Sequence, residues 1–321
     1  MQILGDSNAV LKDLTAIAEE EIMDVGEPLY PQLCSMIDSV DEAYIKIPIQ
    51  TKAEFPVLFT GEREDTSTDV NVISTYNKAT YALTLDYNAD LMQESKAYTF
   101  AEKTREGTIS AKIFPSYNLT KNIIIANPNA YDGVAFYGTG HSWAKAGANL
   151  FNNTASSTGQ TPTALYNDLQ TAVALMKTFL DDKGRLLNPM VKYGEDQLII
   201  HCPAALEVAF RQVIFGSLIP ISIPGSATSA MVATGGKDLG LQGIARLVVD
   251  GYLDATSKTQ WYLHYVGMPQ KPFVYGESYG LRARALGYGT EFQTNTNKVR
   301  IALQHRFVEG VYRMDRSIRI G

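Results

Sequence analysis

The chain has few of the residues on which metal sites and redox chemistry depend. Its 321 residues include two cysteines, two tryptophans and four histidines. Cys34 and Cys202 lie far apart in the sequence, and we expect both to be small, buried apolar residues without a disulfide. No Cys or His spacing matches a zinc-ligand pattern, and His201, next to Cys202 on an expected strand, should point to the opposite face. The sequence therefore predicts no metal site and no bound cofactor.

Long apolar runs are also missing. No run reaches the roughly 18 residues that a membrane-spanning helix needs. Residues 1–6 have neither the basic region nor the apolar core of a signal peptide. We therefore expect no membrane contact and a chain that stays in the cytoplasm of the cell that makes it. The remaining composition, 45% hydrophobic and 19% charged, is that of a globular protein with room for two subdomains.

Charge is modest overall, with a net value of −6, but it is unevenly distributed. Residues 1–50 carry ten acidic residues against two lysines, whereas residues 271–321 carry nine basic residues against four acidic ones. Opposite charge at the two ends of one chain favours contact with a second copy of that chain. We expect Arg313, Arg316 and Arg319 to take part in this contact. The alternative is that these arginines contact nucleic-acid phosphates without reading the sequence.

Hydrophobic periodicity predicts an α+β protein, because helices and strands alternate without regular βαβ units. Apolar residues at helical spacing predict helices at 6–24, 31–38, 95–124, 162–180 and 204–215. Alternating or short apolar runs predict strands at 44–50, 70–76, 81–86, 198–202, 245–249, 260–266, 273–275, 279–289 and 299–303. Pro115 should break or kink the long helix. Residues 131–160 and 216–237 are expected to be long loops.

Two N-terminal segments are candidates for contact with other subunits. The helix at 6–24 is either a docking arm or a first core helix. The strands between 44 and 86 predict a long β-hairpin with more surface than an isolated hairpin can bury. We expect this hairpin to contact a neighbouring subunit through its apolar flanks and charged tip, at Phe55, Phe59, Glu62, Arg63 and Glu64.

The stretch from Tyr131 to His141 combines an acid, several glycines and a histidine, as a catalytic loop does. A triad of Asp132, His141 and Ser142 would need a nucleophile elbow, and no such pattern surrounds the serine. Adjacent Ser and His side chains also rarely reach the same proton. We therefore expect Asp132 and His141 to be structural, with Gly133 at a turn that needs glycine.

Five segments, in their order along the chain, carry a resemblance to a known family. The central segment contains Tyr131, Asp132, Gly133, Phe136 and His141, followed by asparagines. The other four lie at 49–61, 76–86, 184–209 and 272–289. Together they resemble the major head subunits of Mu-type tailed bacteriophages, although residues 217–243 have no counterpart in that pattern.

This resemblance implies the Hong Kong-type capsid fold. Its parts would be an N-terminal arm at 1–48, an extended hairpin loop at 49–85, a peripheral domain with a long spine helix at 86–160 and 270–321, and an axial domain at 161–269. The implied function is that of a major capsid protein, not an enzyme, which forms hexamers and pentamers of an icosahedral virion head.

The partners that the resemblance implies are further copies of the chain, separate scaffold, portal and decoration proteins, and double-stranded DNA bound non-specifically. Assembly would take place in the host cytoplasm. Two alternatives remain open from the residues. The first is the shell protein of an encapsulin-like bacterial nanocompartment, and the second is a soluble hydrolase that uses Asp132 and His141.

Overall fold

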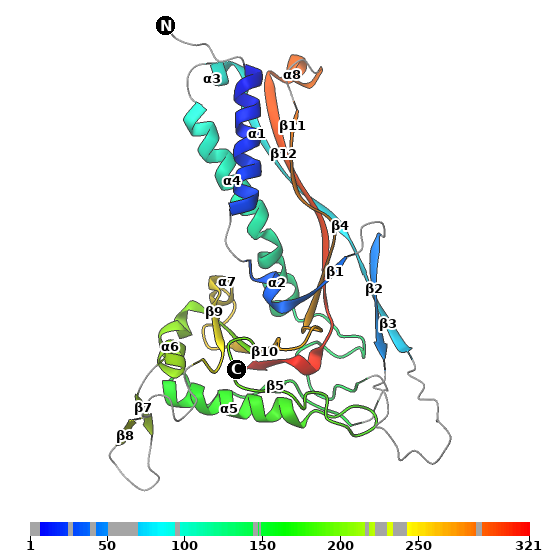
Figure 1. Ribbon diagram of the computed structural model, residues 1–321, viewed down its shortest axis with the longest axis vertical. Coiled ribbons are helices and arrows are strands. Elements are labelled where there is room, and N and C mark those ends of the chain that lie inside the picture. Colours follow the sequence, from blue (N-terminus) through cyan, green and yellow to red (C-terminus); the bar gives the residue numbers. More distant parts are fainter. Residues whose placement is uncertain are drawn as a thin grey trace, which may run out of the picture.

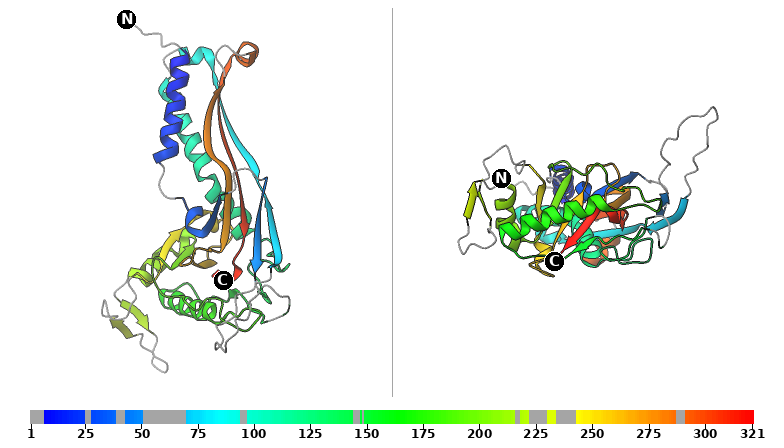
Figure 2. Two further views of the ribbon diagram at one scale, coloured as in Figure 1. Left: turned by 45° about the vertical axis from the view of Figure 1, so that its right-hand side comes forward. Right: turned by 90° about the horizontal axis from the view of Figure 1, so that it is seen from below.

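The computed structural model describes residues 7–24, 28–38, 43–50, 70–93, 97–143, 147, 149–215, 218–221, 230–233, 243–286 and 291–321. They form an elongated molecule with a long upper body and a more compact lower body (Figures 1 and 2). The upper body contains a four-stranded sheet and two long helices, and the lower body contains a five-stranded sheet and its helices. No helix in the described ranges is long and apolar enough to cross a membrane.

The upper body is a layer of helices on a sheet. Its strands, in spatial order, are β1 (Cys34–Asp38), β11 (Phe273–Leu286), β12 (Lys298–Val311) and β4 (Ala79–Asn88). Only β1 and β11 run parallel. The helices α1 (Ser7–Asp24) and α4 (Ala97–Asn118) lie along one face of this sheet (Figure 1). Alternate residues of β12, such as Val299 and Ile301, are buried on the side of the helices, as the two-residue period of a strand requires.

The first helix is part of the core. Leu11, Leu14 and Ala18 are buried in one cluster with Leu85 of β4 and Leu303 of β12. Burial of this apolar stripe against the sheet is the usual source of helix stability in proteins. Of the two alternatives for residues 6–24, the structure therefore supports a core helix.

The long helix does not break at its proline. The sequence predicted a break or kink at Pro115. No break is present, because α4 continues through the proline to Asn118, where the α-helical geometry gives way to the π-helix η1 (Leu119–Ile125). The residue before the proline, Phe114, packs on the rings of Tyr81 and Phe307, with centroids 4.9 and 6.1 Å away. This packing on the sheet holds the helix in place, although a proline removes one backbone hydrogen bond.

The hairpin differs in part from its prediction. Strand β2 (Tyr44–Gln50) pairs antiparallel with β3 (Val70–Asn77), as expected. The stretch at 81–86 was predicted to be a hairpin strand, but it belongs to β4 and pairs with β12 in the upper sheet. Residues 51–69, which include all five predicted contact residues of the hairpin, lie outside the described residues.

The hairpin stem packs on the lower part of the upper sheet. Ile45 lies against Gly276 of β11, and the Tyr76 ring lies against Gly310 of β12. A Cβ atom at Gly310 would approach the Tyr76 ring to 2.7 Å. The Tyr76 hydroxyl donates a 2.5 Å hydrogen bond to the carbonyl oxygen of Val311. Glycine is needed at position 310 because the aromatic ring occupies the space of a side chain.

The lower body is built around a five-stranded sheet. Its strands, in spatial order, are β5 (Thr154–Ala155), β13 (Ser317–Ile320), β10 (Trp261–Tyr265), β6 (Leu198–Cys202) and β9 (Arg246–Val249). Strands β6 and β10 are buried along their whole length. Helix α5 (Pro162–Thr178) packs against α6 (Glu207–Phe215) and β13. The predicted Thr161 cap is present, because its side chain accepts a 3.3 Å hydrogen bond from the Ala164 amide.

Several short elements complete or correct the predicted order. The predicted helix at 31–38 is wrong in its second half, because α2 (Tyr30–Leu33) ends where β1 begins. The loop predicted at 216–237 contains a small antiparallel pair, β7 (Leu218–Ile221) and β8 (Ala230–Ala233). The remaining short helices are α3 (Ala89–Gln93), η2 (Ala204–Leu206), α7 (Gly251–Asp254), α8 (Glu291–Thr296) and η4 (Met314–Arg316).

Candidate functional site

The residues of the central sequence segment lie in the loop between η1 and α5. Residues Asn129 and Ala135 form an isolated antiparallel bridge that closes a tight turn. Gly133 occupies this turn with a φ of 80°, a conformation that glycine adopts without strain. The side chain of Asp132 accepts a 3.1 Å hydrogen bond from the amide of Val134, which closes the turn from inside.

Asp132 and His141 are brought together by this turn. Oδ2 of Asp132 lies 2.8 Å from Nδ1 of His141, whose side chain is fully buried. The same oxygen accepts a 3.4 Å hydrogen bond from the amide of Ser142. Burial raises the pKa of the Asp132 carboxyl, but the hydrogen bonds from His141, Val134 and Ser142 outweigh burial, so the pKa lies below its usual value. The hydroxyl of Tyr131 donates to the Ser142 carbonyl at 2.9 Å and closes the loop a second time.

This geometry disfavours the hydrolase alternative. In a Ser-His-Asp triad the carboxylate binds one ring nitrogen and the serine hydroxyl binds the other. Here Asp132 binds Nδ1 of His141, but Nε2 is buried and has no hydrogen-bond partner among the described residues. The same nitrogen lies 3.4 Å from the place where a Cβ atom at Gly138 would stand. Among the described residues, Nε2, which would act on a substrate, is therefore shielded from solvent.

Asparagines hold the second half of the loop through their side-chain amides. Asn153 is fully buried, and its Nδ2 donates to the carbonyl oxygens of Phe136 and Met314 at 2.6 and 3.0 Å. Its Oδ1 accepts from the amide of Gly138 at 2.9 Å. Its backbone carbonyl oxygen accepts a 3.0 Å hydrogen bond from the backbone amide of Arg319 in β13. The Asn153 amide therefore ties the loop to the C-terminal end of the chain. The sequence pattern included the asparagines after His141, but it did not predict that Asn153 connects the loop to the C-terminal residues.

The positions of two C-terminal arginines differ from the prediction that they lie on a surface that contacts a second copy of the chain. Arg313 and Arg316 are each only 4% exposed. The Arg313 guanidinium donates two 2.7 Å hydrogen bonds to Asp315 and lies 4.2 Å from the centre of the Trp143 ring. Arg316 also lies near Asp315, at 4.0 Å, and donates to the backbone oxygen of Gln270.

These two arginines therefore serve the fold of their own chain and do not form an exposed basic surface. Burial raises the pKa of the Asp315 carboxyl, but the adjacent guanidinium groups outweigh burial and lower it. Arg319 is half-buried over the Tyr137 ring, with 5.8 Å between the guanidinium carbon and the ring centre. Its contact with another subunit stays a prediction.

The remaining candidates for chemistry are buried. Cys34 and Cys202 are free and fully buried, as predicted. His201 lies 3.2 Å from Asp250, whose carboxylate also accepts a 2.6 Å hydrogen bond from Thr120 and caps α7. Within the described ranges, no three or more Cys, His, Asp or Glu side chains are placed to bind a metal ion.

Comparison with known proteins identifies the class of fold. Neither the protein-family models nor the curated proteins contain a match to the sequence. The solved structures contain many matches, and they establish that the chain has the Hong Kong-type capsid fold.

The individual structures span almost the whole chain. The mature capsid of bacteriophage PhiM1 matches with a TM-score of 0.56 and 10% identity, covering 92% of this chain and 87% of that one. A virus-like particle from Pyrococcus furiosus matches with a TM-score of 0.54 and 7% identity, covering 97% and 98%. The capsid of cyanophage P-SCSP1u matches with a TM-score of 0.53 and 11% identity, covering 92% and 88%. At these identities the shared property is the fold.

Proposed function

We propose that this chain is the major capsid protein of a tailed bacteriophage. Copies of it would form the hexamers and pentamers of an icosahedral head that encloses double-stranded DNA. The observation that carries this proposal is the fold, which matches capsid and virus-like particle subunits over 92–97% of the chain. The ordered resemblance of five sequence segments to Mu-type head subunits supports the narrower family assignment.

The shape of the molecule supports a role in a lattice of subunits. The upper body is long, the β2–β3 stem lies beside it, and the β7–β8 pair lies at the far end of the lower body (Figures 1 and 2). Hairpins at the periphery of a subunit suit contact with neighbouring copies, since an isolated hairpin buries little of its own surface. Identical copies then associate by repeating the same contacts.

The Asp132–His141 loop contributes to this role as a structural element. It is part of the segment that connects η1, at the end of α4, to α5, and Asn153 in the same segment is hydrogen-bonded to the C-terminal residues Met314 and Arg319. We infer that the Asp132–His141 pair and Asn153 hold this loop in one position against the lower sheet. A fixed position would let every subunit offer its contacts at the same angle.

Electron microscopy of the purified full-length chain tests the proposal. We expect closed particles when the protein is concentrated in the presence of a scaffold protein and salt is varied. Particles that package DNA through a portal support the virion assignment. Closed particles filled with an enzyme cargo would instead support the nanocompartment alternative. Only monomers or small rings under all these conditions would overturn a shell function.

Deletion of residues 60–68 tests the contact predicted for the hairpin tip. The deleted stretch contains Glu62, Arg63 and Glu64 but leaves the β2–β3 stem and its packing on Gly276 and Gly310 intact. We expect the circular dichroism spectrum and urea unfolding of the subunit to be unchanged, while particle formation is lost. A variant that assembles as well as the unmodified chain would contradict this contact, and an unfolded variant would place the tip in the core.

A further inference from the structure

Strand β4 is an open edge of the upper sheet. Its ten residues pair with β12 in a continuous register, and β12 is its only strand partner among the described residues. The stretch Ala79–Leu85 contains no charged residue, proline or glycine, and five of its seven residues are exposed. Natural edge strands are usually protected by charges, prolines or bulges, because an unprotected edge pairs with other chains. The β4 edge lacks these protections over seven residues.

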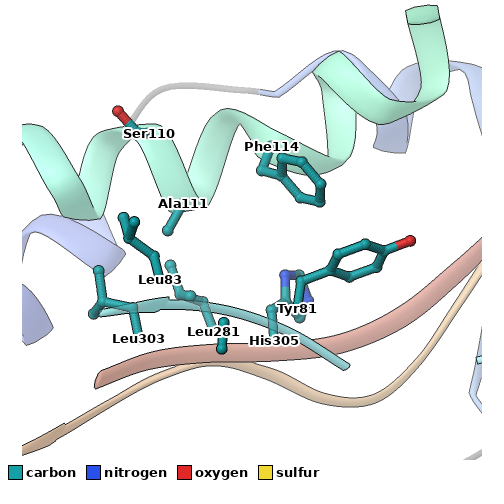
Figure 3. A pocket seen from close by; sticks show the side chains of 9 residues that line it. Tyr81, Leu83, Ser110, Ala111, Phe114, Leu281, Leu303 and His305 are labelled. Atoms are coloured by element: carbon teal, nitrogen blue, oxygen red, sulfur yellow. The ribbon is translucent and has the colours of Figure 1, made fainter. Parts of the chain in front are cut away.

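An apolar groove lies beside this edge. It has a volume of about 290 Å³ and is situated between α4 and the sheet (Figure 3). Leu83 of β4 lies opposite Ala111 and Phe114 of α4, with Leu281 and Leu303 deeper in the sheet (Figure 3). No Asp, Glu, Lys or Arg is among the described residues that line it. Leu83 is 36% exposed at this site, so the edge and the mostly apolar groove, whose one titratable lining residue among those described is His305, form one surface.

We propose that β4 pairs antiparallel with β4 of a second copy of this chain, across a two-fold axis perpendicular to the sheet. The pairing would join the two upper sheets into one continuous sheet. Addition of a strand to an open edge satisfies its free backbone groups, and neighbouring pockets then select the side chains. This contact rests on the proposed self-association, which supplies the second copy.

The uncharged character of the β4 edge indicates which partner strand fits it. The edge carries no charge and the groove beside it is mostly apolar, so an uncharged and partly apolar strand fits there without burying a charge, and Ala79–Leu85 of a second copy is such a strand. Side chains alternate between the two faces of a strand. With this axis, Tyr81 and Leu83 of both copies lie on the side of the helices, where each copy covers part of the other's groove. No like charges meet, and the contact closes by symmetry as most homo-oligomeric contacts do.

Single cysteines in β4 test the pairing directly. At the two-fold axis one residue faces its own copy, and directly opposed residues of an antiparallel pair have Cα atoms about 4.5–5.5 Å apart, which is within the range for a disulfide. The variants are Ala82→Cys, Leu83→Cys and Thr84→Cys in the full chain. The native cysteines are fully buried and give little background. Leu91→Cys is the matched control, because Leu91 of α3 is 37% exposed against 36% for Leu83.

We expect mild oxidation to give a covalent dimer that is strongest at one β4 position and several-fold above the Leu91→Cys control. Amide hydrogen exchange of the unmodified chain gives a second measurement. Alternate amides of residues 79–85 should exchange quickly in the dilute subunit and slowly in the oligomer, since half of them have no partner on β12.

The outcomes separate this contact from the proposed function. Particles in which β4 neither crosslinks above the control nor gains protection would overturn the pairing and leave the shell function standing. Dimers with a crosslink in β4 that never form particles would support the pairing and overturn the shell function. A chain that stays monomeric at all concentrations would overturn both.

Discussion

Replacement of Glu309 by glutamine should change how the stability of the subunit depends on pH. Glu309 lies on β12 and is 7% exposed. One carboxyl oxygen accepts a 2.8 Å hydrogen bond from Asn118 at the end of the spine helix, and the other has no partner among the described residues. Burial raises the pKa of this carboxyl from 4.5 to about 8. The folded subunit therefore holds an uncharged carboxylic acid at neutral pH.

The size and sign of the effect follow from this pKa. The unfolded chain releases the proton near pH 4.5, whereas the folded chain keeps it until about pH 8. Below pH 4.5 the Glu309 carboxyl is protonated in both the folded and the unfolded chain, so its ionisation does not affect the free energy of unfolding. Between the two values each pH unit removes about 1.4 kcal/mol from the free energy of unfolding, or about 5 kcal/mol over the whole interval. Above pH 8 both states are ionised and the loss is complete.

The Glu309→Gln variant lacks this loss. Its amide oxygen can accept the Asn118 hydrogen bond, but its NH₂ group takes the place of the buried Oε1, which has no partner among the described residues, at a cost of about 1–3 kcal/mol independent of pH. The informative quantity is therefore the difference in unfolding free energy between variant and unmodified chain. We expect it to rise in favour of the variant between pH 4.5 and 8, measured by urea unfolding of the unassembled subunit at pH 5, 6, 7 and 8.

Glu277→Gln on the adjacent strand is the control with the opposite sign. The hydrogen bond from His305 lowers the pKa of the Glu277 carboxyl, so its stabilisation is present at neutral pH and is lost as pH falls through the folded pKa. The Glu277→Gln substitution should therefore lower the free energy of unfolding more at pH 7 than in acid. A difference for Glu309→Gln that does not change with pH would refute the reasoning, because it would mean that Glu309 ionises alike in the folded and unfolded chain.

Two further substitutions test the loop and the hairpin stem, both by urea unfolding. His141→Ala should lower the free energy of unfolding by about 1–3 kcal/mol, because it leaves the buried Asp132 carboxylate without its main partner; an unchanged stability would contradict the structural role. Gly310→Ala should cost about 1–3 kcal/mol, because the new Cβ atom meets the Tyr76 ring at 2.7 Å. Gly280→Ala is its control, with nothing within 4 Å of the new atom, and equal effects of the two changes would reject the packing argument.

The sequence predicted which residues form the candidate site but not which contacts they make. The sequence pattern marked Asp132, Gly133 and His141, and the turn at Gly133 has the positive φ that was expected. The pattern could not show that Asn153 reaches Met314, because 161 residues separate them along the chain. It also assigned Arg313 and Arg316 to the surface, where arginines are usually found. Their burial depends on Asp315 and Trp143, which only the folded chain brings around them.

The sequence by itself determined the elements whose signals are local. The helices at α1 and α5 and the buried strand β6 follow from apolar spacing and from caps such as Thr161, which depend on neighbours within a few residues. The tertiary structure decided the partners of each strand. Residues 70–77 and 79–88 read alike in the sequence, yet β3 pairs with β2 and β4 pairs with β12, more than 200 residues away. Strand pairing depends on which surfaces the rest of the chain leaves free, and for the same reason only the fold reveals the open edge of β4.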